Sequence, residues 1–233
     1  MVKHAYAVGR VRALEAHLLD QNQLSRMVEA PSFEAAFNIL EETPYAEKID
    51  KLEQAFAFEG LLRLELISLR ELMDRLAPGQ ELLEVMFAKY ELPEEDYFLA
   101  LNQAAQKHRV PLFTRYAQGY TLLFKLKKQL LSGPLEAEKI VERYRYTDFN
   151  RVVTAGLEPY RQTGELQVLE REIDNFLMDI LRRAKYRVMG IEPLIGFVYA
   201  KEIEIKLLRL ILTGKLLQIK IEDLKERLRL PYV

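Results

Sequence analysis

Apolar residues recur along most of the chain with the spacing of an amphipathic helix. In one stretch they stand three or four positions apart, at Leu166, Leu169, Ile173, Phe176, Ile180 and Ala184. This spacing places the side chains on one face of an α-helix. The same pattern predicts a helix from about Ala46 to Leu76. It ends at Ala77–Gln80, because Pro78 cannot continue a helix and Gly79 tolerates the turn.

Further helix ends are predicted at proline and glycine residues: Leu92-Pro93, Val110-Pro111, Ser132–Pro134, Gly156, Thr163-Gly164, Gly190 with Pro193, and Thr213-Gly214. No stretch alternates apolar and polar residues between hairpin turns, as strands do. Hydrophobic residues make up 49% of the 233 residues, with only 10 Gly and 9 Pro, a composition that favours helices. The sequence therefore predicts an all-α fold of roughly ten helical pieces.

Three sequence landmarks recur at nearly constant offset. Offsets of 115, 112 and 113 residues relate Glu42–Tyr45 to Leu157–Tyr160, Val85–Lys89 to Phe197–Lys201, and Met27–Glu29 to Ile140–Glu142. A fixed offset predicts duplicated helical modules, residues 1–116 and 117–233. The first has 13 basic and 19 acidic residues, the second 21 and 16. This asymmetry is compatible with modules that dock together and with modules that face different partners.

Two Pro-Tyr pairs occupy equivalent places in the proposed repeat. Proline disfavours helical geometry at the residue before it, and a tyrosine ring can pack beneath the resulting turn while its hydroxyl satisfies a backbone group. We therefore interpret Pro44, Tyr45, Pro159 and Tyr160 as structural turn residues. A binding role for the tyrosines is the less favoured alternative.

Conventional catalytic residues are scarce. The chain has no Cys, three His (His4, His17 and His108) and four Ser, with no Gly-rich turn among them. A phosphate-binding loop needs more than the Gly214-Lys215 pair, and Glu15 and His17 are two positions apart, so on a helix they face different sides. We expect no catalytic residue, cofactor or metal ion. An enzyme would require a pocket around the histidines.

Two basic segments interleave cations with tyrosines, at 143–146 and 181–187. Such segments can bind nucleic acid. The net charge of −1 argues against bulk affinity for nucleic acid or anionic lipid, and cations at a helix C-terminus are ordinary. We therefore expect no nucleic-acid partner.

The segment from Tyr199 to Thr213 is apolar around most of its circumference. Its polar residues Glu202, Lys206 and Arg209 form one narrow stripe at helical spacing. Solvent, an internal channel or a partner could face this stripe. We select these three residues, with the neighbouring Lys201 and Glu204, as candidate partner-interface residues.

No run of apolar residues reaches the length of about 20 that a membrane-spanning helix needs. The first ten residues lack the long apolar core of a secretory signal. We expect a cytoplasmic protein that reaches a membrane only through partners.

Several segments resemble one known family. Ala7–Glu15 resembles the opening helix of the C subunit of V/A-type rotary ATPases of archaea and bacteria, the counterpart of the eukaryotic d subunit. Leu40–Tyr45 is similar to a further element of that family. More detailed likeness lies near the C-terminus, in Gly190–Leu194, Tyr199–Glu204, Leu208-Arg209, Gly214-Lys215, and Leu228 with Tyr232-Val233.

The resemblance implies a non-catalytic, all-helical coupling subunit. In that family three helical modules form a funnel between the membrane proteolipid ring and the central rotor stalk, and torque passes through it to drive ion transport. This chain offers two modules, with residues 93–145 as a remnant of a middle one, which puts the closed funnel and its axial socket in doubt. The alternative is a stand-alone helical scaffold in another assembly.

Overall fold

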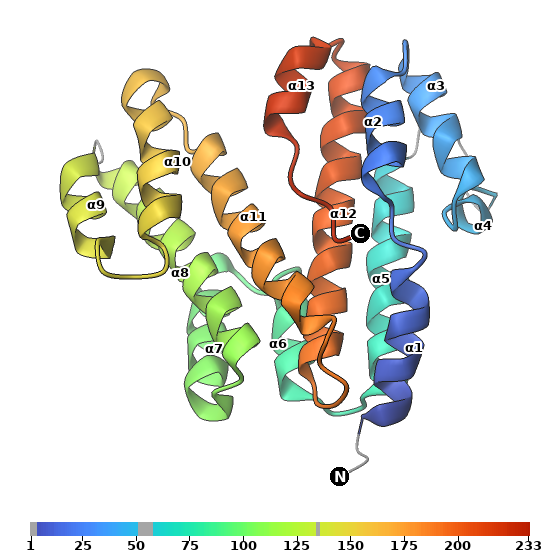
Figure 1. Ribbon diagram of the computed structural model, residues 1–233, viewed down its shortest axis with the longest axis horizontal. Helices are drawn as coiled ribbons and strands as arrows, with labels where there is room; N and C mark the ends of the chain where they lie inside the picture. The colour runs from blue at the N-terminus through green and yellow to red at the C-terminus, as the bar shows by residue number, and fades with distance from the viewer. Residues whose placement is uncertain (1–3, 51–57, 134–135) are drawn as a thin grey trace. The chain divides into compact units, whose positions relative to one another are not determined.

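The computed structural model describes residues 4–50, 58–133 and 136–233. These residues form 13 α-helices and one 3-10 helix, η1, and they contain no strand (Figure 1). The predicted all-α class is therefore confirmed.

The chain divides into two compact units, each described separately. Unit 1 comprises residues 1–80 and 182–233, and unit 2 comprises residues 81–181. Unit 1 contains α1 (Ala5–Glu15), α2 (Gln21–Glu29), α3 (Phe33–Asn38), η1 (Ile39–Glu42), α4 (Ala46–Ile49), α5 (Phe58–Leu76), α12 (Glu192–Leu216) and α13 (Ile221–Arg227). Unit 2 contains α6 (Glu81–Ala88), α7 (Glu94–His108), α8 (Pro111–Ser132), α9 (Ala137–Tyr144), α10 (Asn150–Thr163) and most of α11 (Gln167–Ala184).

The long helix α12 forms the core of unit 1. Its 25 residues are apolar on nearly all sides, and a helix of that kind is stable only when other elements surround it. It packs against α1, α2, α3, α5 and α13 (Figure 1). Pro193 stands in its first turn, where the missing backbone N–H costs no hydrogen bond.

Unit 2 is built on the helical hairpin of α7 and α8. Arg109 ends α7 in the left-handed region (φ 52°), and Pro111 begins α8. Aromatic side chains join the two helices: Phe98 stacks on Phe124 with ring centroids 4.5 Å apart, and the hydroxyls of Tyr97 and Tyr116 are 2.9 Å apart. The stacked rings and the buried pair of hydroxyls favour one orientation of α7 against α8, which apolar packing alone does not specify.

Two predicted helix ends and one predicted turn are helical in the structure, which corrects the sequence interpretation. Gly156 and Pro159-Tyr160 lie inside α10, and Gly214 lies inside α12. Near the end of a helix a proline removes one backbone hydrogen bond, and α10 continues for another turn to Gly164 (φ 71°). Gly214 serves packing, because an added Cβ would collide with the Leu224 side chain of α13.

Other sequence expectations take a different form in the structure. The helix expected over residues 46–76 contains α4 and α5, and its part at residues 51–57 lies outside the described residues. The compact units divide at residues 80 and 181, and the predicted module boundary after residue 116, which stays a prediction, lies within α8. The duplication stays a prediction.

We predict that Gly156→Ala destabilises the protein. A Cβ at Gly156 would lie 2.5 Å from the Leu169 Cα of α11, and a backbone atom cannot rotate away. The expected loss in unfolding free energy is about 2 kcal/mol, measured by chemical denaturation. Gly9→Ala is the control: apart from its chain neighbours and the nearby backbone of its own helix, no atom lies within 4 Å of the added Cβ. This exposed helical position should gain about 0.5–1 kcal/mol. Equal effects at the two sites would contradict the packing argument.

Candidate functional site

A buried network of charged side chains lies in the core of unit 1. At its centre is Glu204 of α12, which is 5% exposed. Its Oε1 accepts hydrogen bonds from the Tyr45 hydroxyl (2.7 Å) and from Lys201 Nζ (2.7 Å). Its Oε2 accepts from the backbone N–H of Leu19, at 2.5 Å. A buried carboxylate is tolerated when its oxygens have donors of this kind.

The network continues from α12 to α5 through Lys201. Lys201 Nζ lies 2.7 Å from Glu65 Oε1 and also 5.0 Å from the centre of the Tyr45 ring. The second oxygen of Glu65 pairs with Lys48 Nζ of α4 at 2.5 Å. Two carboxylates and two ammonium groups therefore alternate, and their formal charges cancel. We call Tyr45, Lys48, Glu65, Lys201 and Glu204 the core network.

The surroundings shift the pKa values of three network groups. Burial alone would raise the pKa of Glu65, but its pairs with Lys201 and Lys48 outweigh burial and hold that pKa below the ordinary 4.5. Burial alone would lower the pKa of Lys201, but Glu204 and Glu65 raise it above the ordinary 10.5. Burial and the two nearby carboxylates raise the pKa of Tyr45 well above 10.0. At neutral pH the lysine and Glu65 are charged and the tyrosine is protonated.

The core network joins segments that are distant in the chain. Its members come from α12, α5, α4 and the turn before α4, and Glu204 also binds the segment between α1 and α2. Within the turn, the Thr43 hydroxyl donates to the Leu40 carbonyl at 2.6 Å and accepts from the Tyr45 N–H at 3.2 Å. This local bonding aims the Tyr45 ring at α12. The arrangement can hold helices in register, and each charge is engaged by another residue of the chain.

A second cluster holds the C-terminal segment against unit 1. The Tyr232 hydroxyl donates to Glu15 Oε1 at 2.7 Å, and Arg12 Nη1 lies 2.6 Å from the same oxygen. Lys185 donates to the Tyr232 carbonyl at 2.9 Å, and its Nζ lies 4.3 Å from the centre of the Tyr232 ring. Arg182 donates to the Pro231 carbonyl. We call these contacts the C-terminal clasp. The spacing of Val8, Val11 and Glu15 on one face of α1 is the sequence signal that could have pointed to Glu15.

The structure places the five candidate interface residues in two groups. Lys201, Glu202 and Glu204 lie inside unit 1, and both glutamates are at most 5% exposed. Lys201 and Glu204 contact residues of their own chain, and a partner-interface role for the five residues stays a prediction. Lys206 is half-buried, and Arg209 is exposed and bridges to Glu59 of α5, with Nε 2.9 Å from Oε1.

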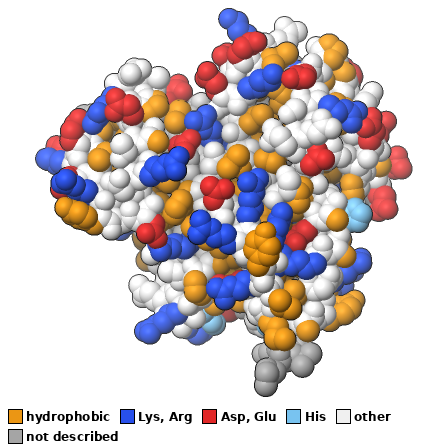
Figure 2. Space-filling view, in the orientation of Figure 1, with side chains coloured by type: hydrophobic (Ala, Val, Ile, Leu, Met, Phe, Trp, Pro, Cys, Tyr) orange, Lys and Arg blue, Asp and Glu red, His pale blue; other side chains and the backbone are white. Residues whose placement is uncertain are grey.

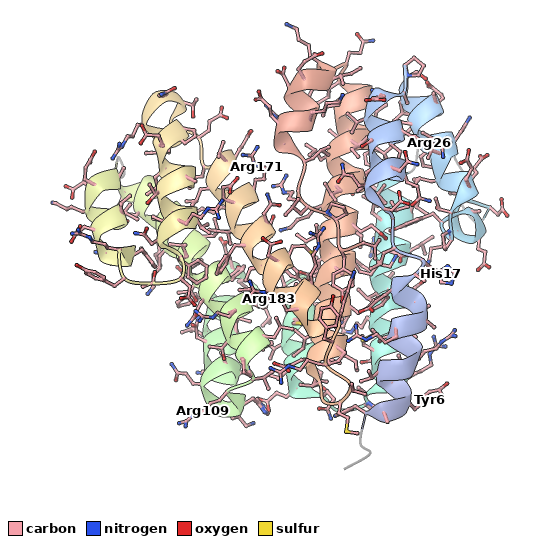
Figure 3. All side chains as sticks on the ribbon, viewed as in Figure 1. Tyr6, His17, Arg26, Arg109, Arg171 and Arg183 are labelled. Carbon is pink, nitrogen blue, oxygen red and sulfur yellow. The ribbon has the colours of Figure 1, made fainter. Side chains whose placement is uncertain are left out.

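Lys215 has a structural role that sequence reasoning missed. Its Nζ donates to the carbonyls of Val28 (2.6 Å) and Ala30 (2.5 Å), at the C-terminal end of α2. A cation at this end satisfies carbonyls that have no partner within the helix. Arg26, labelled in Figure 3, lies on the same helix and pairs with Glu42 at 2.8 Å.

The three histidines lie at or beside different helix ends. His4 and His17 flank opposite ends of α1, while His108 ends α7 in unit 2, with Nε2 2.9 Å from Glu81 Oε2. Among the residues that the structure describes, no group of three or more His, Asp or Glu side chains is placed to hold a metal ion. Within the same residues, no helix is long and apolar enough to cross a membrane.

The fold and the core network define an all-helical protein whose polar core residues bind one another. The ATP synthase (C/AC39) subunit family matches residues 7–94 and 114–227. The chain therefore belongs to the ATP synthase (C/AC39) subunit family, as the sequence resemblance implied. No solved structure matches the chain significantly.

Relatives of the chain include subunits of A-type ATP synthases and of a V-type sodium ATPase. It is 23% identical to the A-type ATP synthase C subunit of Methanocaldococcus jannaschii, over 97% of this chain and 58% of the relative. It is 23% identical to the Pyrococcus abyssi A-type ATP synthase C subunit, over 76% of this chain and 53% of the relative. Over 37% of this chain and 26% of the relative, it is 40% identical to the V-type sodium ATPase C subunit of Enterococcus hirae. The chain thus spans little more than half the length of the first relative.

We predict that Tyr45→Phe weakens unit 1. The substitution keeps the ring but removes a hydroxyl donor from the buried Glu204 carboxylate. Loss of a bond to a buried charged group costs about 2–3 kcal/mol in unfolding free energy. Tyr6→Phe is the matched control, since Tyr6 is 79% exposed and projects away from α1 (Figure 3). Chemical denaturation of both variants measures the difference. Equal unfolding free energies for the two variants would show that the Tyr45–Glu204 hydrogen bond does not stabilise unit 1.

The core network also predicts how stability depends on pH. The lowered pKa of Glu65 means that its contribution is present above about pH 4.5 and is lost as pH falls through its folded-state pKa. The raised pKa of Lys201 means that its contribution is present below about pH 10.5 and is lost as pH rises through the folded-state value. The unfolding free energy, measured as a function of pH, should therefore fall at acid pH and at alkaline pH. In Glu65→Gln the acid side should flatten. An unchanged acid side in Glu65→Gln would contradict the assignment.

Proposed function

We propose that the chain is a non-catalytic coupling subunit of a V/A-type rotary ATPase or ATP synthase. In this role it links the central rotor stalk to the membrane proteolipid ring, so that rotation is coupled to ion transport. The observation that carries the proposal is the family match over residues 7–94 and 114–227. The names of the relatives, C subunits of A-type ATP synthases and of a V-type sodium ATPase, support it further.

A part that transmits torque has to resist deformation, and the core network supports this requirement. An apolar contact is non-directional, whereas a hydrogen-bonded ion pair holds two side chains at one distance and angle. Lys201 and Glu204 anchor α12 to α5 and to the turn at Tyr45 through such contacts. Sliding α12 along its neighbours would separate buried charges, which costs about 3–5 kcal/mol for a broken pair. Unit 1 is therefore suited to move as one stiff body.

The partner surface of the proposed subunit includes the exposed polar residues of α12. Arg209 donates two hydrogen bonds to Glu59, from Nε to Oε1 at 2.9 Å and from Nη2 to Oε2 at 3.0 Å, and both side chains are about half exposed. The pair can exchange with charged groups of a partner at little cost, because surface ion pairs contribute less than about 1 kcal/mol. Lys206 lies one turn away on the same helix.

The second candidate function is a stand-alone helical scaffold in another assembly. The all-helical fold, whose buried charged residues contact one another, suits this role as well. Membership of a gene cluster with rotary-ATPase subunits favours the coupling role, and an isolated gene favours the scaffold.

We expect the tagged full-length chain to co-purify with stalk and proteolipid subunits from detergent-solubilised membranes of its source organism. Glu59→Lys with Arg209→Glu reverses both charges of the exposed pair while keeping the pair itself, so it should fold but recover fewer stalk or ring subunits. Lys139→Glu with Glu136→Lys is the matched control, because Lys139 and Glu136 form another exposed pair, 2.5 Å apart. Quantitative mass spectrometry of the purified complexes gives the measurement. Recovery of neither stalk nor ring subunits by the unmodified chain would overturn the coupling role.

A further inference from the structure

The segment that joins α11 to α12 carries a concentration of positive charge. Arg182, Arg183, Lys185 and Arg187 follow one another within six positions, and no acidic residue lies between Asp179 and Glu192. The first two belong to the last turn of α11, where cations complement the helix dipole. That explanation does not extend to Lys185 and Arg187, which lie beyond the end of the helix. We call residues 182–191 the basic loop.

The C-terminal clasp and α1 fix the base of the basic loop. Lys185 donates to the Tyr232 carbonyl, and Arg12 of α1 donates to the Arg187 carbonyl at 3.1 Å. Both acceptors are neutral backbone groups, so these two bonds leave the positive charge of the loop unchanged. Arg187 also lies 3.2 Å from Glu192, at the start of α12. The loop is thus held at its base, and Arg183 is exposed on α11 (Figure 3).

Large apolar side chains protrude from the same loop. Tyr186 is 87% exposed, Val188 76% and Met189 62%. Across the described part of the chain, no other segment exposes three large apolar residues within four positions. In Figure 2, hydrophobic side chains lie beside Lys and Arg side chains where this loop lies in Figure 1. Exposed apolar groups that gather in one place mark an interaction site.

We propose that the basic loop is a contact surface for a bilayer that contains anionic phospholipids. Side chains this exposed protrude, and a bilayer interface accepts protruding apolar groups without a preformed pocket. Tyrosine favours the headgroup level, and cations beside it attract acidic headgroups. The net charge of −1 for the whole chain does not cancel this attraction, because salt screens charges beyond about 8 Å.

The composition of the loop favours lipid over nucleic acid. Binding to single-stranded nucleic acid depends on aromatic rings that stack with successive bases. The basic loop has one aromatic side chain, Tyr186, and the two apolar residues that follow, Val188 and Met189, have no ring. Transfer of aliphatic side chains from water to the acyl boundary of a bilayer lowers the free energy, whereas aliphatic side chains add little to base stacking.

A single tryptophan provides a specific probe, because the chain contains none. In Met189→Trp, fluorescence should shift to the blue when the full-length protein is mixed with vesicles of phosphatidylcholine and phosphatidylglycerol in equal parts. Vesicles of phosphatidylcholine alone should give a much smaller shift. Tyr146→Trp is the matched control, since Tyr146 is 89% exposed and no other large apolar side chain within four positions of it is exposed. No shift at position 189, or an equal shift at position 146, would overturn the proposal.

Three double variants of the Met189→Trp protein test the role of the cations. Arg183→Glu with Arg187→Glu should lower binding to the anionic vesicles by at least about tenfold in co-sedimentation. Arg183→Lys with Arg187→Lys should bind as tightly as the parent, because headgroup attraction depends on charge and not on the guanidinium fork. Lys125→Glu with Lys139→Glu, an equal charge change at exposed sites of unit 2, should leave binding unchanged. Circular dichroism verifies the fold of each variant.

Three results would overturn the lipid assignment. Charge reversal at Arg183 and Arg187 that leaves vesicle binding intact would exclude the loop as the contact. Loss of binding in the double lysine variant would indicate a geometrically specific protein site. Binding of single-stranded RNA without binding of anionic vesicles would assign the loop to nucleic acid. The assay contains only the purified chain and vesicles, so its outcome is independent of whether stalk or ring subunits bind.

Discussion

Charged groups in the middle of unit 1 have to neutralise one another, and the arrangement of its helices depends on this constraint. A carboxylate that leaves water without partners loses far more free energy than apolar packing around it returns. Glu204 and Glu65 are both buried, so a cation, Lys201, has to lie between their carboxylates. Tyr45 provides a further hydrogen-bond donor to Glu204, and Lys48 provides a second cation to Glu65. The observed register of α12 against α5 and the α4 turn meets all these demands.

Local signals in the sequence predicted the class and many helix ends, because the residues responsible act on their immediate neighbours. Pro93, Pro111 and Gly164 stand at helix boundaries in the structure. Gly156 and Gly214 misled the prediction, because a glycine in a sequence can signal either a helix end or a close approach. Gly156 lies close to Leu169, and Gly214 lies close to Leu224. These contacts depend on how the helices cross, and the periodicity of apolar residues carries no information about helix crossing.

The candidate site was predictable to a similar extent. The sequence identified Lys201 and Glu204 as polar residues on an apolar helix, and Tyr45 as an aromatic residue at a turn. It did not show that these residues contact one another, since Tyr45 and Glu204 are 159 positions apart. A polar residue on a buried helix can face a partner protein or another part of its own chain. The contacts with Glu65 and Leu19 are tertiary, so the local sequence does not contain them.

The contacts that hold unit 1 together also link the two ends of the chain. Glu204 binds Leu19 across 185 positions, and Tyr232 binds Glu15 across 217. Closing a loop of that size costs conformational entropy before any contact compensates for it. Unit 2, residues 81–181, lies within both of these loops, and its compact fold reduces the length of free chain that has to be closed. The burial of ions in unit 1 therefore depends on helices that contribute none of those ions, and the core network and the C-terminal clasp close only when both ends have met.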